Sequence, residues 1–339
     1  MELKLNTAEL SKSPFILVAP FFFLGTAMVV MKFIIPDTTP LFLASFRLIP
    51  AGFLVVLLAT LLKIPQPKGW KAWLWILLFA LIDGAMFQGF LTVGLVNTGA
   101  GLGAVLIDAQ PLVVALLASW LFGDIIGLWG WLGLIIGLTG ICLCGLPTEW
   151  IINLLAGNGI PISPESLTLN SIAQSGELLM IFAALSMSFG TIIIRKVRDY
   201  VDPVMATGWH MFLGGIPLLT LSFLSESNQW QNLSTQGWLG LGYATVFGTA
   251  VTYGLFFFLA ANGNLTSVSA LIFLTPVFAL VFSNIFLQEQ LTKFQWVGVS
   301  LTLVSVYLVN QRQELAKRFS PEAIAASGDV LIESPKKES

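Results

Sequence analysis

The chain has 339 residues, of which 56% are hydrophobic and only 10% are charged, and its formal net charge is −2 at pH 7. A typical soluble domain carries about 25% charged residues, so this composition excludes a soluble globular protein. The basic residues form no cluster interleaved with aromatic side chains, which excludes a nucleic-acid-binding protein. The apolar runs are continuous and about 20 residues long, the length of a bilayer-spanning helix rather than a barrel strand. The sequence therefore predicts an all-α integral membrane protein.

Ten apolar runs follow one another along the chain, separated by short polar segments. The segment before the first run is polar and acidic, and no cleavage site follows that run, so we interpret the run as a retained helix and not a signal peptide. The predicted transmembrane helices cover residues 14–35, 40–62, 72–95, 101–122, 127–145, 175–195, 203–225, 238–261, 266–287 and 294–310.

The distribution of basic residues predicts how the ten spans are oriented in the membrane. Cytoplasmic segments of membrane proteins carry an excess of Lys and Arg. With ten spans and a cytoplasmic N-terminus, thirteen of the sixteen Lys and Arg residues fall on the cytoplasmic side, and both termini are predicted to be cytoplasmic. The thirteen are Lys4, Lys12, Lys63, Lys68, Lys71, Arg195, Lys196, Arg198, Arg312, Lys317, Arg318, Lys336 and Lys337.

Two segments lie outside the predicted spans. Residues 146–174 are polar and rich in turn-forming residues, and they are predicted to form an extracytoplasmic loop. Within them, the stretch EWIINLLA fits either a short helix at the membrane surface or an unstructured loop. Residues 311–339 are charged and poor in apolar residues, so we expect a disordered cytoplasmic tail.

The second half of the chain repeats the first. At a constant offset of 165 residues, seven positions recur, among them Pro111 with Pro276 and Asp124 with Glu289. The full set of pairs is Gly25 and Gly190, Gly89 and Gly254, Asn97 and Asn262, Pro111 and Pro276, Asp124 and Glu289, Trp131 and Trp296, and Gly133 and Gly298. Each half, 14–145 and 175–310, holds five predicted spans. Because five is odd, the two halves must enter the membrane in opposite directions, which predicts an inverted repeat.

Three charged residues lie well inside predicted spans, away from the span ends. A charge at a helix centre costs about 2.5–3.5 kcal/mol on insertion scales, so Arg47, Asp83 and Asp108 must face a hydrated cavity or a partner. Arg47 and Asp108 lie at the same depth, and the sequence favours an ion pair between them. A pair between Asp83 and Arg47 is the second possibility. The alternative to a binding or coupling role is that such a pair only holds two helices together.

Further polar side chains in the spans are candidates for the same site. His210 is the only histidine and corresponds to Arg47 at an offset of 163, so it is a candidate for binding or protonation; a packing role is the alternative. Hydrogen-bonding capacity adds four more candidates. On an ideal helix Gln88 does not share the face of Asp83, so the two are not expected to reach one ligand. The four are Gln88, Gln110, Trp209 and Tyr253.

Two prolines interrupt predicted spans. Pro111 and Pro276 each remove one backbone hydrogen bond and free a carbonyl group. That carbonyl must be satisfied by water, a side chain or a ligand. We expect a kink at each position, which either contributes a polar wall to a binding site or is a static bend.

Several stretches carry a family resemblance. The first half contains PLFLASFRLIPAGFL and QPLVVALLASWLFGD, and the second half contains LTPVFALVFSNIFLQEQLT followed by WVGVSLTLVSVYLV. These resemble the two repeats of the EamA branch of the drug/metabolite transporter superfamily over about residues 15–310. The resemblance implies ten helices, a central cavity lined by spans one to four and six to nine, and transport of small metabolites. Two features depart from the family pattern: Leu24 stands where it has Trp, and the 146–174 loop is longer.

The favoured function is a secondary transporter for a small organic solute, and not an enzyme. A cavity with Arg, Asp, His and aromatic side chains suits an amino acid or another zwitterion. Protons are a possible coupling ion, a homo-oligomer is possible, and neither cofactor nor metal is expected. The expected location is the plasma membrane of a bacterium. Two alternatives stay open: a scaffold or sensor without transport, and an intramembrane aspartyl enzyme using Asp83 and Asp108.

Overall fold

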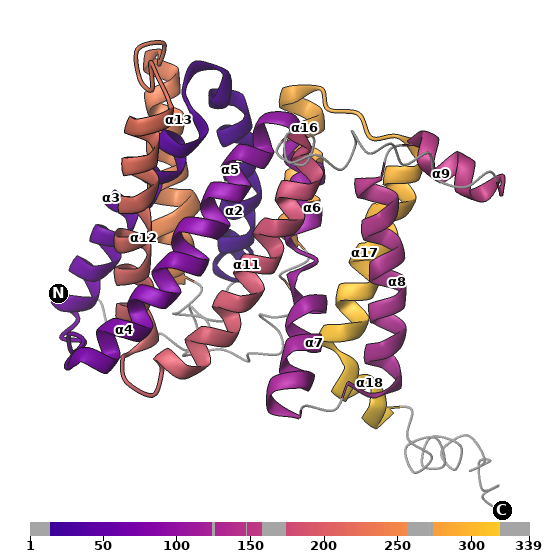
Figure 1. The fold of residues 1–339 in the computed structure, drawn as a ribbon, viewed down its shortest axis with the longest axis horizontal. Helices are drawn as coiled ribbons and strands as arrows, with labels where there is room; N and C mark the ends of the chain where they lie inside the picture. Colours follow the sequence, from indigo (N-terminus) through magenta and orange to yellow (C-terminus); the bar gives the residue numbers. More distant parts are fainter. Residues whose placement is uncertain are drawn as a thin grey trace, which may run out of the picture.

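The computed structural model describes residues 14–123, 126–146, 148–157, 174–255, 271 and 274–318, and the regular elements in these ranges are all helices (Figure 1). The helices of the first half are α2 (Pro14–Ile34), η1 (Ile35–Asp37), α3 (Pro40–Leu61), α4 (Trp70–Phe79), η2 (Ala80–Met86), α5 (Phe87–Asn97), α6 (Ala100–Ile107), α7 (Gln110–Phe122), α8 (Gly127–Gly145) and α9 (Thr148–Leu155). Those of the second half are α11 (Gly176–Val197), α12 (Pro203–Ser225), α13 (Thr235–Thr245), η4 (Val246–Val251), α16 (Leu274–Leu287), α17 (Lys293–Asn310) and α18 (Arg312–Arg318).

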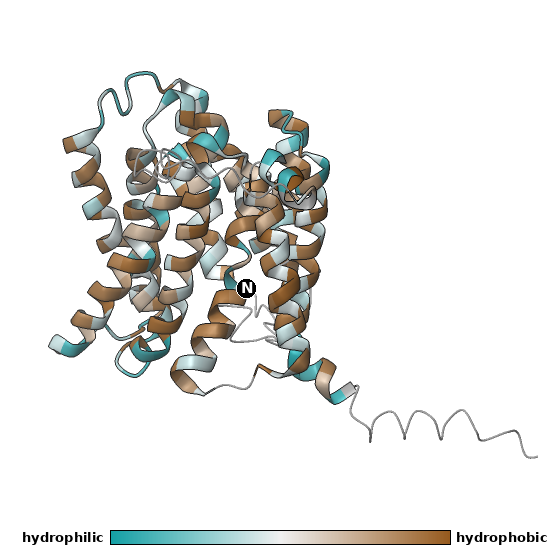
Figure 2. Ribbon diagram, turned by 45° about the vertical axis from the view of Figure 1, so that its right-hand side comes forward, coloured by the Kyte–Doolittle hydropathy of each residue, from teal (hydrophilic) through white to brown (hydrophobic). Residues whose placement is uncertain are grey.

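Within the described ranges, seven helical stretches are long and apolar enough to cross a membrane. They are Phe15–Asp37, Pro40–Leu61, Trp70–Asn97, Ala100–Phe122, Gly127–Gly145, Gly176–Val197 and Pro203–Ser225. The other three predicted spans overlap in sequence with α13 and η4, with the shorter apolar helix α16, and with α17. Part of the eighth and the first part of the ninth lie outside the described residues. Most residues along the helices are apolar, and hydrophilic residues gather in the connections at the two ends of the helix bundle (Figure 2).

Helices from the two halves pack against each other in pairs. The two most extensive pairings join α3 to α12 and α8 to α17, and Figure 1 shows α8 and α17 side by side at one edge of the bundle. In the first pair, Gly215 lies against Ile49 and Gly208 lies against Val56, so the chain numbers run in opposite directions. In the second, Gly133 faces Val309 and Gly140 faces Gly298. Both pairs join repeat-equivalent helices that run antiparallel.

Both halves contain a π-helical segment in their third span. η2 covers Ala80–Met86 and η4 covers Val246–Val251, and the offset of 165 residues places 81–86 on 246–251. A π-helical turn holds an extra residue, so the side chains that follow it are rotated relative to an ideal α-helix. The sequence pattern did not predict either segment.

The fourth predicted span is broken in its middle. α6 ends at Ile107 and α7 begins at Gln110, so Asp108 and Ala109 lie in a turn, and Pro111 belongs to the first turn of α7. Proline lacks the backbone N–H group. At a helix start this loss has no cost, because the N–H groups of the first turn have no acceptor within the helix. The second proline, Pro276, is the third residue of α16, and the residues just before that helix lie outside the described part of the chain.

The two segments outside the predicted spans each contain a helix. The stretch EWIINLLA, for which a short helix and an unstructured loop were both considered, is helical, because α9 covers Thr148–Leu155. The expectation of a wholly disordered tail from residue 311 was wrong at its start, because α18 covers Arg312–Arg318. An ion pair at a spacing of three residues, with Lys317 Nζ 3.3 Å from Glu314 Oε1, contributes to this helix. The remaining tail residues lie outside the described ranges.

Close approach of α12 to η2 depends on glycine, and this gives a first testable prediction. A Cβ atom added to Gly214 would lie 2.6 Å from Gly84 Cα, whereas one added to Gly242 would meet nothing within 4 Å. We expect Gly214→Ala to lower the free energy of unfolding by about 1–3 kcal/mol, the usual cost of overpacking. Gly242→Ala should not destabilise the protein. Thermal unfolding in detergent compares the two variants, and equal melting temperatures would contradict the packing described here.

Candidate functional site

Five of the predicted site residues come together in the interior of the protein, where segments of the two halves meet. They belong to five different helical segments, three from the first half and two from the second. The first half provides Arg47 on α3, Asp83 on η2 and Gln88 on α5, and the second provides His210 on α12 and Tyr253, which follows η4 in the helical stretch 252–255.

Asp83 and His210 form the first contact of this site. His210 Nε2 lies 3.1 Å from Asp83 Oδ2, and the two residues are only 2% and 9% exposed. The ring of Phe79 stacks on the imidazole with 4.0 Å between ring centroids. Phe79 is four residues before Asp83 and therefore lies on nearly the same face of the helix, a spacing from which the sequence could have identified it.

Glycines allow the backbones to approach closely enough for this contact. Gly190 on α11 leaves space that the carboxylate of Asp83 occupies, and Gly84 lies directly against the backbone of His210 and Gly214. Any larger side chain at these positions would push η2 away from α11 and α12. The imidazole Nδ1 is buried and has no hydrogen-bond partner.

Arg47 and Gln88 form the second contact. Arg47 is 3% exposed, and its Nη2 donates a hydrogen bond to Gln88 Oε1. Its Nε atom is buried without a partner, and no ion pair among the described residues includes Arg47. The guanidinium group is thus a buried charge with unused donor capacity.

Tyr253 lies beside the two contacts. It packs against the buried cluster that contains Leu48, Ala85 and Met211, which are close in the chain to Arg47, Asp83 and His210. The five side chains therefore form one polar cluster that contains a cation, an acid, an imidazole, a phenol and an amide. Among the residues that the structure describes, no group of three or more His, Cys, Asp or Glu side chains could hold a metal ion.

The predicted ion pair between Arg47 and Asp108 is wrong. Arg47 bonds to Gln88, and Asp108 lies in the turn between α6 and α7, where its Oδ2 is buried without a partner. Equal depth in the membrane does not make two helices neighbours: α3 packs against α12, α5 and α13, whereas α6 packs against α2, α11 and α16. The second possibility, Asp83 with Arg47, is also not the observed pairing.

The expectation that Gln88 and Asp83 cannot serve one site needs correction as well. It assumed an ideal helix through residues 72–95. Asp83 itself lies in the π-helical segment η2, whose last three residues separate it from α5 and change its rotation relative to Gln88. Gln88 and Asp83 consequently contact Arg47 and His210, two members of the same cluster.

Two other predicted residues make contacts elsewhere. Gln110 Nε2 donates to Thr191 Oγ1 at 2.5 Å and so links α7 to α11. Trp209 Nε1 donates to Gln66 Oε1 at 3.0 Å, in the connection between α3 and α4. Both contacts hold helices or connections together, and neither residue contacts the central cluster through them.

The arrangement suits binding more than covalent chemistry. An aspartyl enzyme needs two carboxylates that share a proton, but Asp83 pairs with His210 and Asp108 has an unpartnered oxygen in a different helix pair. A buried cation and a buried acid held at fixed positions can instead bind the opposite charges of a small polar solute.

Comparison with known proteins places the chain among transporters. The model of the EamA-like transporter family matches residues 12–146 and 174–311. An uncharacterized transporter of Synechocystis is 56% identical over 315 residues, covering 93% of this chain and 94% of that protein. A WAT1-related chloroplastic protein of Arabidopsis thaliana is 47% identical over 299 residues, covering 87% and 68%. The uncharacterized inner membrane transporter YedA of Escherichia coli is 26% identical over 290 residues, covering 84% and 86%. A solved crystal structure shares the fold with a TM-score of 0.62 at 13% identity, covering 90% and 97%.

The buried contact between Asp83 and His210 should appear as energetic coupling. In a double-mutant cycle with Asp83→Asn and His210→Asn, we expect a coupling of about 1–3 kcal/mol, because each single change leaves a buried polar partner unsatisfied. Unfolding in detergent measures it. As a control, Asp83→Asn combined with Thr302→Val on the distant helix α17 should be additive. Additive behaviour of Asp83 and His210 themselves would refute the pair.

Proposed function

We propose that this chain, which belongs to the EamA-like transporter family, is a secondary transporter that carries a small organic metabolite by alternating access. The observation that carries this proposal is the buried cluster around Arg47 and Asp83, to which both halves of the chain contribute. In transporters built from repeated halves, the substrate site lies between the halves, so that their relative movement exposes it first to one side and then to the other.

We further propose that the halves are inverted repeats. Residues 14–145 and 175–310 would each form five transmembrane helices, joined by the extracytoplasmic loop 146–174 and followed by the cytoplasmic tail 311–339. The antiparallel packing of α3 with α12 and of α8 with α17 supports this arrangement, because equivalent helices of an inverted repeat run in opposite directions. The distribution of basic residues supports a cytoplasmic location of both termini.

The charges of the cluster favour an amino acid or another zwitterion as substrate. Arg47 has unused hydrogen-bond donors and would bind a carboxylate, which fits the planar guanidinium group well. Asp83 would bind the ammonium group, and Tyr253 lies beside these contacts. The depth of the site would exclude a solute that leaves either charge without a partner, because an unpaired charge is costly in a dry environment.

The proposed location is the plasma membrane of a bacterium. The chain is a multi-pass membrane protein, one relative is described as an inner membrane transporter, and another is described as chloroplastic. The partners would be the lipid bilayer and the transported solute, with protons as a candidate coupling ion. Assembly into a homo-oligomer is compatible with this function.

The proposed topology can be tested by labelling. Single cysteines would be introduced at residues 5 and 330, and at residue 165 in the long connection, in a chain with Cys142→Ser and Cys144→Ala. A membrane-impermeant maleimide added to intact cells should modify only the cysteine at residue 165, and the other two should react after the membrane is permeabilised. Reaction of the two terminal positions from opposite sides would contradict an even number of spans.

The proposed substrate site can be tested by flux. Purified protein in lipid vesicles should move at least one member of a radiolabelled amino acid panel. Arg47→Met should reduce this flux at least about tenfold, the effect of losing one charge-assisted hydrogen bond, and Arg47→Lys should retain part of it. Arg312→Met, which removes an arginine outside the cluster, should have no effect. Full flux in Arg47→Met would contradict the proposed site. For Asp108→Asn, loss of flux with folding retained would show that the carboxylate has a functional role and is not used only for packing.

A further inference from the structure

The turn between α5 and α6 is held by two charged side chains from other parts of the chain. Glu289, in the connection between α16 and α17, accepts hydrogen bonds from Ala100 N at 2.8 Å and Gly101 N at 3.2 Å. On the other side of the turn, Lys32 Nζ of α2 donates to Leu95 O at 2.7 Å and Val96 O at 3.0 Å. An acid thus lies at the positive end of α6 and a base at the negative end of α5, as the helix dipoles favour.

The contact between Glu289 and α6 replaces a local helix cap. The N-cap position of α6 is Gly99, which has no side chain to cap the helix. A Cβ atom at Gly99 would lie 2.8 Å from Glu289 Oε2, and one at Gly101 would lie 2.7 Å from Ser283 Oγ of α16. The amides of the first turn of α6 therefore depend on a carboxylate that is 189 residues away in the chain and belongs to the other half.

The backbone of Glu289 is fixed to its own helix. Asn284 Nδ2 donates to Glu289 O at 3.0 Å, and Glu289 N donates to Ser283 O at 3.3 Å. The preceding residue, Gln288, has a φ of 53°, which reverses the chain after α16. Glu289 therefore moves together with the end of α16, while its side chain holds α6.

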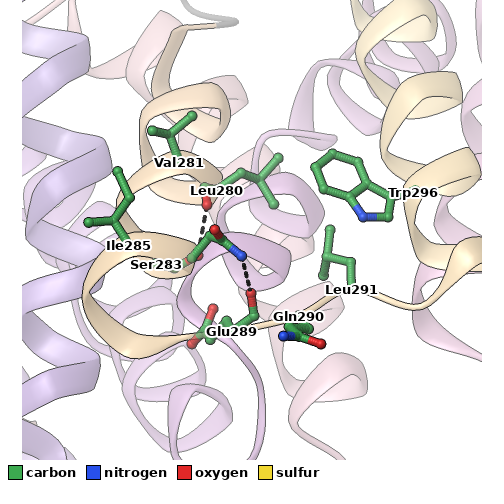
Figure 3. Close-up of a pocket in the computed structure, with 9 residues that line it drawn as sticks. Leu280, Val281, Ser283, Ile285, Glu289, Gln290, Leu291 and Trp296 are labelled. Atoms are coloured by element: carbon green, nitrogen blue, oxygen red, sulfur yellow. Dashed lines mark hydrogen bonds between the residues drawn. The ribbon is translucent and has the colours of Figure 1, made fainter.

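The described residues leave a space open between α16 and α17. α16 packs against α2 and α6, whereas α17 packs against α8. Between α16 and α17 lies a cavity of about 550 Å³ that is lined by Leu280, Glu289 and Trp296 among others (Figure 3). Figure 3 shows Leu291 and Trp296 on the α17 side of this space. Leu280 and Ser283, which line this cavity, also face Gly101 of α6, so the cavity borders the α6 contact. The end of α16 can shift toward α17 into this space.

We infer that the Glu289–α6 contact closes the transport path at this end of the molecule, and that its release, with a tilt of α16, opens the path. The inference rests on the proposed alternating-access function. The contact joins an element of the second half to an element of the first, so a movement of the end of α16 relative to α6 must break it. Once it is broken, two α6 amides and one carboxylate are free for water, which lowers the cost of the open state.

A second carboxylate at the same end of the molecule provides a matched control. Glu226, just after α12, accepts hydrogen bonds from Leu41 N at 2.9 Å and Phe42 N at 3.2 Å at the start of α3. It also joins the second half to the first by capping a helix. However, α3 and α12 pack against each other through Gly52, Gly208 and Gly215 in their middle portions, so loss of the Glu226 contact alone should not separate them.

The test uses accessibility and needs no substrate. The reporter is Ala104→Cys, one turn below Ala100 on α6 and only 3% exposed, in a chain with Cys142→Ser and Cys144→Ala. A membrane-impermeant maleimide is added on the side where α16 ends. Glu289→Gln should raise the rate of labelling about tenfold, the population change that follows from weakening one charge-assisted hydrogen bond. Glu289→Asp, whose shorter side chain keeps the charge but does not reach α6, should do the same, and Glu226→Gln should not.

The outcomes separate this inference from the proposed function. Faster labelling in both Glu289 variants, with gel-filtration profiles like the parent, supports the contact as the closing element even if no panel solute is transported. Unchanged labelling in a Glu289 variant that folds, or an equal increase in Glu226→Gln, overturns it even if transport is measured. If Glu289→Gln does not fold, the rate in Glu289→Asp decides alone.

Discussion

Charged groups that leave water must be satisfied inside the protein, and this requirement organises the centre of the molecule. In the bilayer interior neither a backbone nor a side-chain polar group can turn to solvent. Arg47 meets Gln88, and Asp83 meets His210, with Tyr253 beside these contacts. Because these partners come from both halves of the chain, satisfying the charges also ties the halves together at the position where a solute would bind.

Irregular backbone makes this arrangement possible. The π-helical segments η2 and η4 occur at equivalent positions of the two halves, and the helix broken between α6 and α7 leaves Asp108 in a turn. Regular α-helices would fix every side chain at 100° steps and leave fewer ways to direct Asp83 and Gln88 to one cluster. Glycines at positions 84, 190 and 214 then let the backbones approach within contact distance. Such features cost stability locally, and their concentration around one cluster is typical of functional sites.

The same logic extends to one end of the bundle, where helix termini present unpaired amides. Neither Thr39 before α3 nor Gly99 before α6 caps its helix with its own side chain. Glu226 and Glu289 of the second half accept those hydrogen bonds instead. Helix termini of one half are thus stabilised by carboxylates of the other, so the closed arrangement of this end is favoured by electrostatics in addition to apolar packing. A charge-assisted contact of this kind is strong while it is buried from water and weak once it is hydrated. This property suits a contact that must hold two helices together in one state and separate in another.

The sequence by itself determined the class of protein, the positions of most helices, the repetition of the two halves and the identity of the charged residues that had to be buried. These follow from composition, from the length of apolar runs and from residues such as Pro111 and Arg47, whose chemistry is unfavourable in a lipid environment wherever they lie. Only the tertiary structure decided which partners those residues take. Arg47 binds Gln88 and not Asp108, because α3 and α6 are not packing neighbours, and Gln88 reaches the cluster because a π-helical turn rotates it. Pairing depends on which helices touch and on small shifts in helical register. Both are set by packing over long distances in the chain, so no local pattern of residues records them.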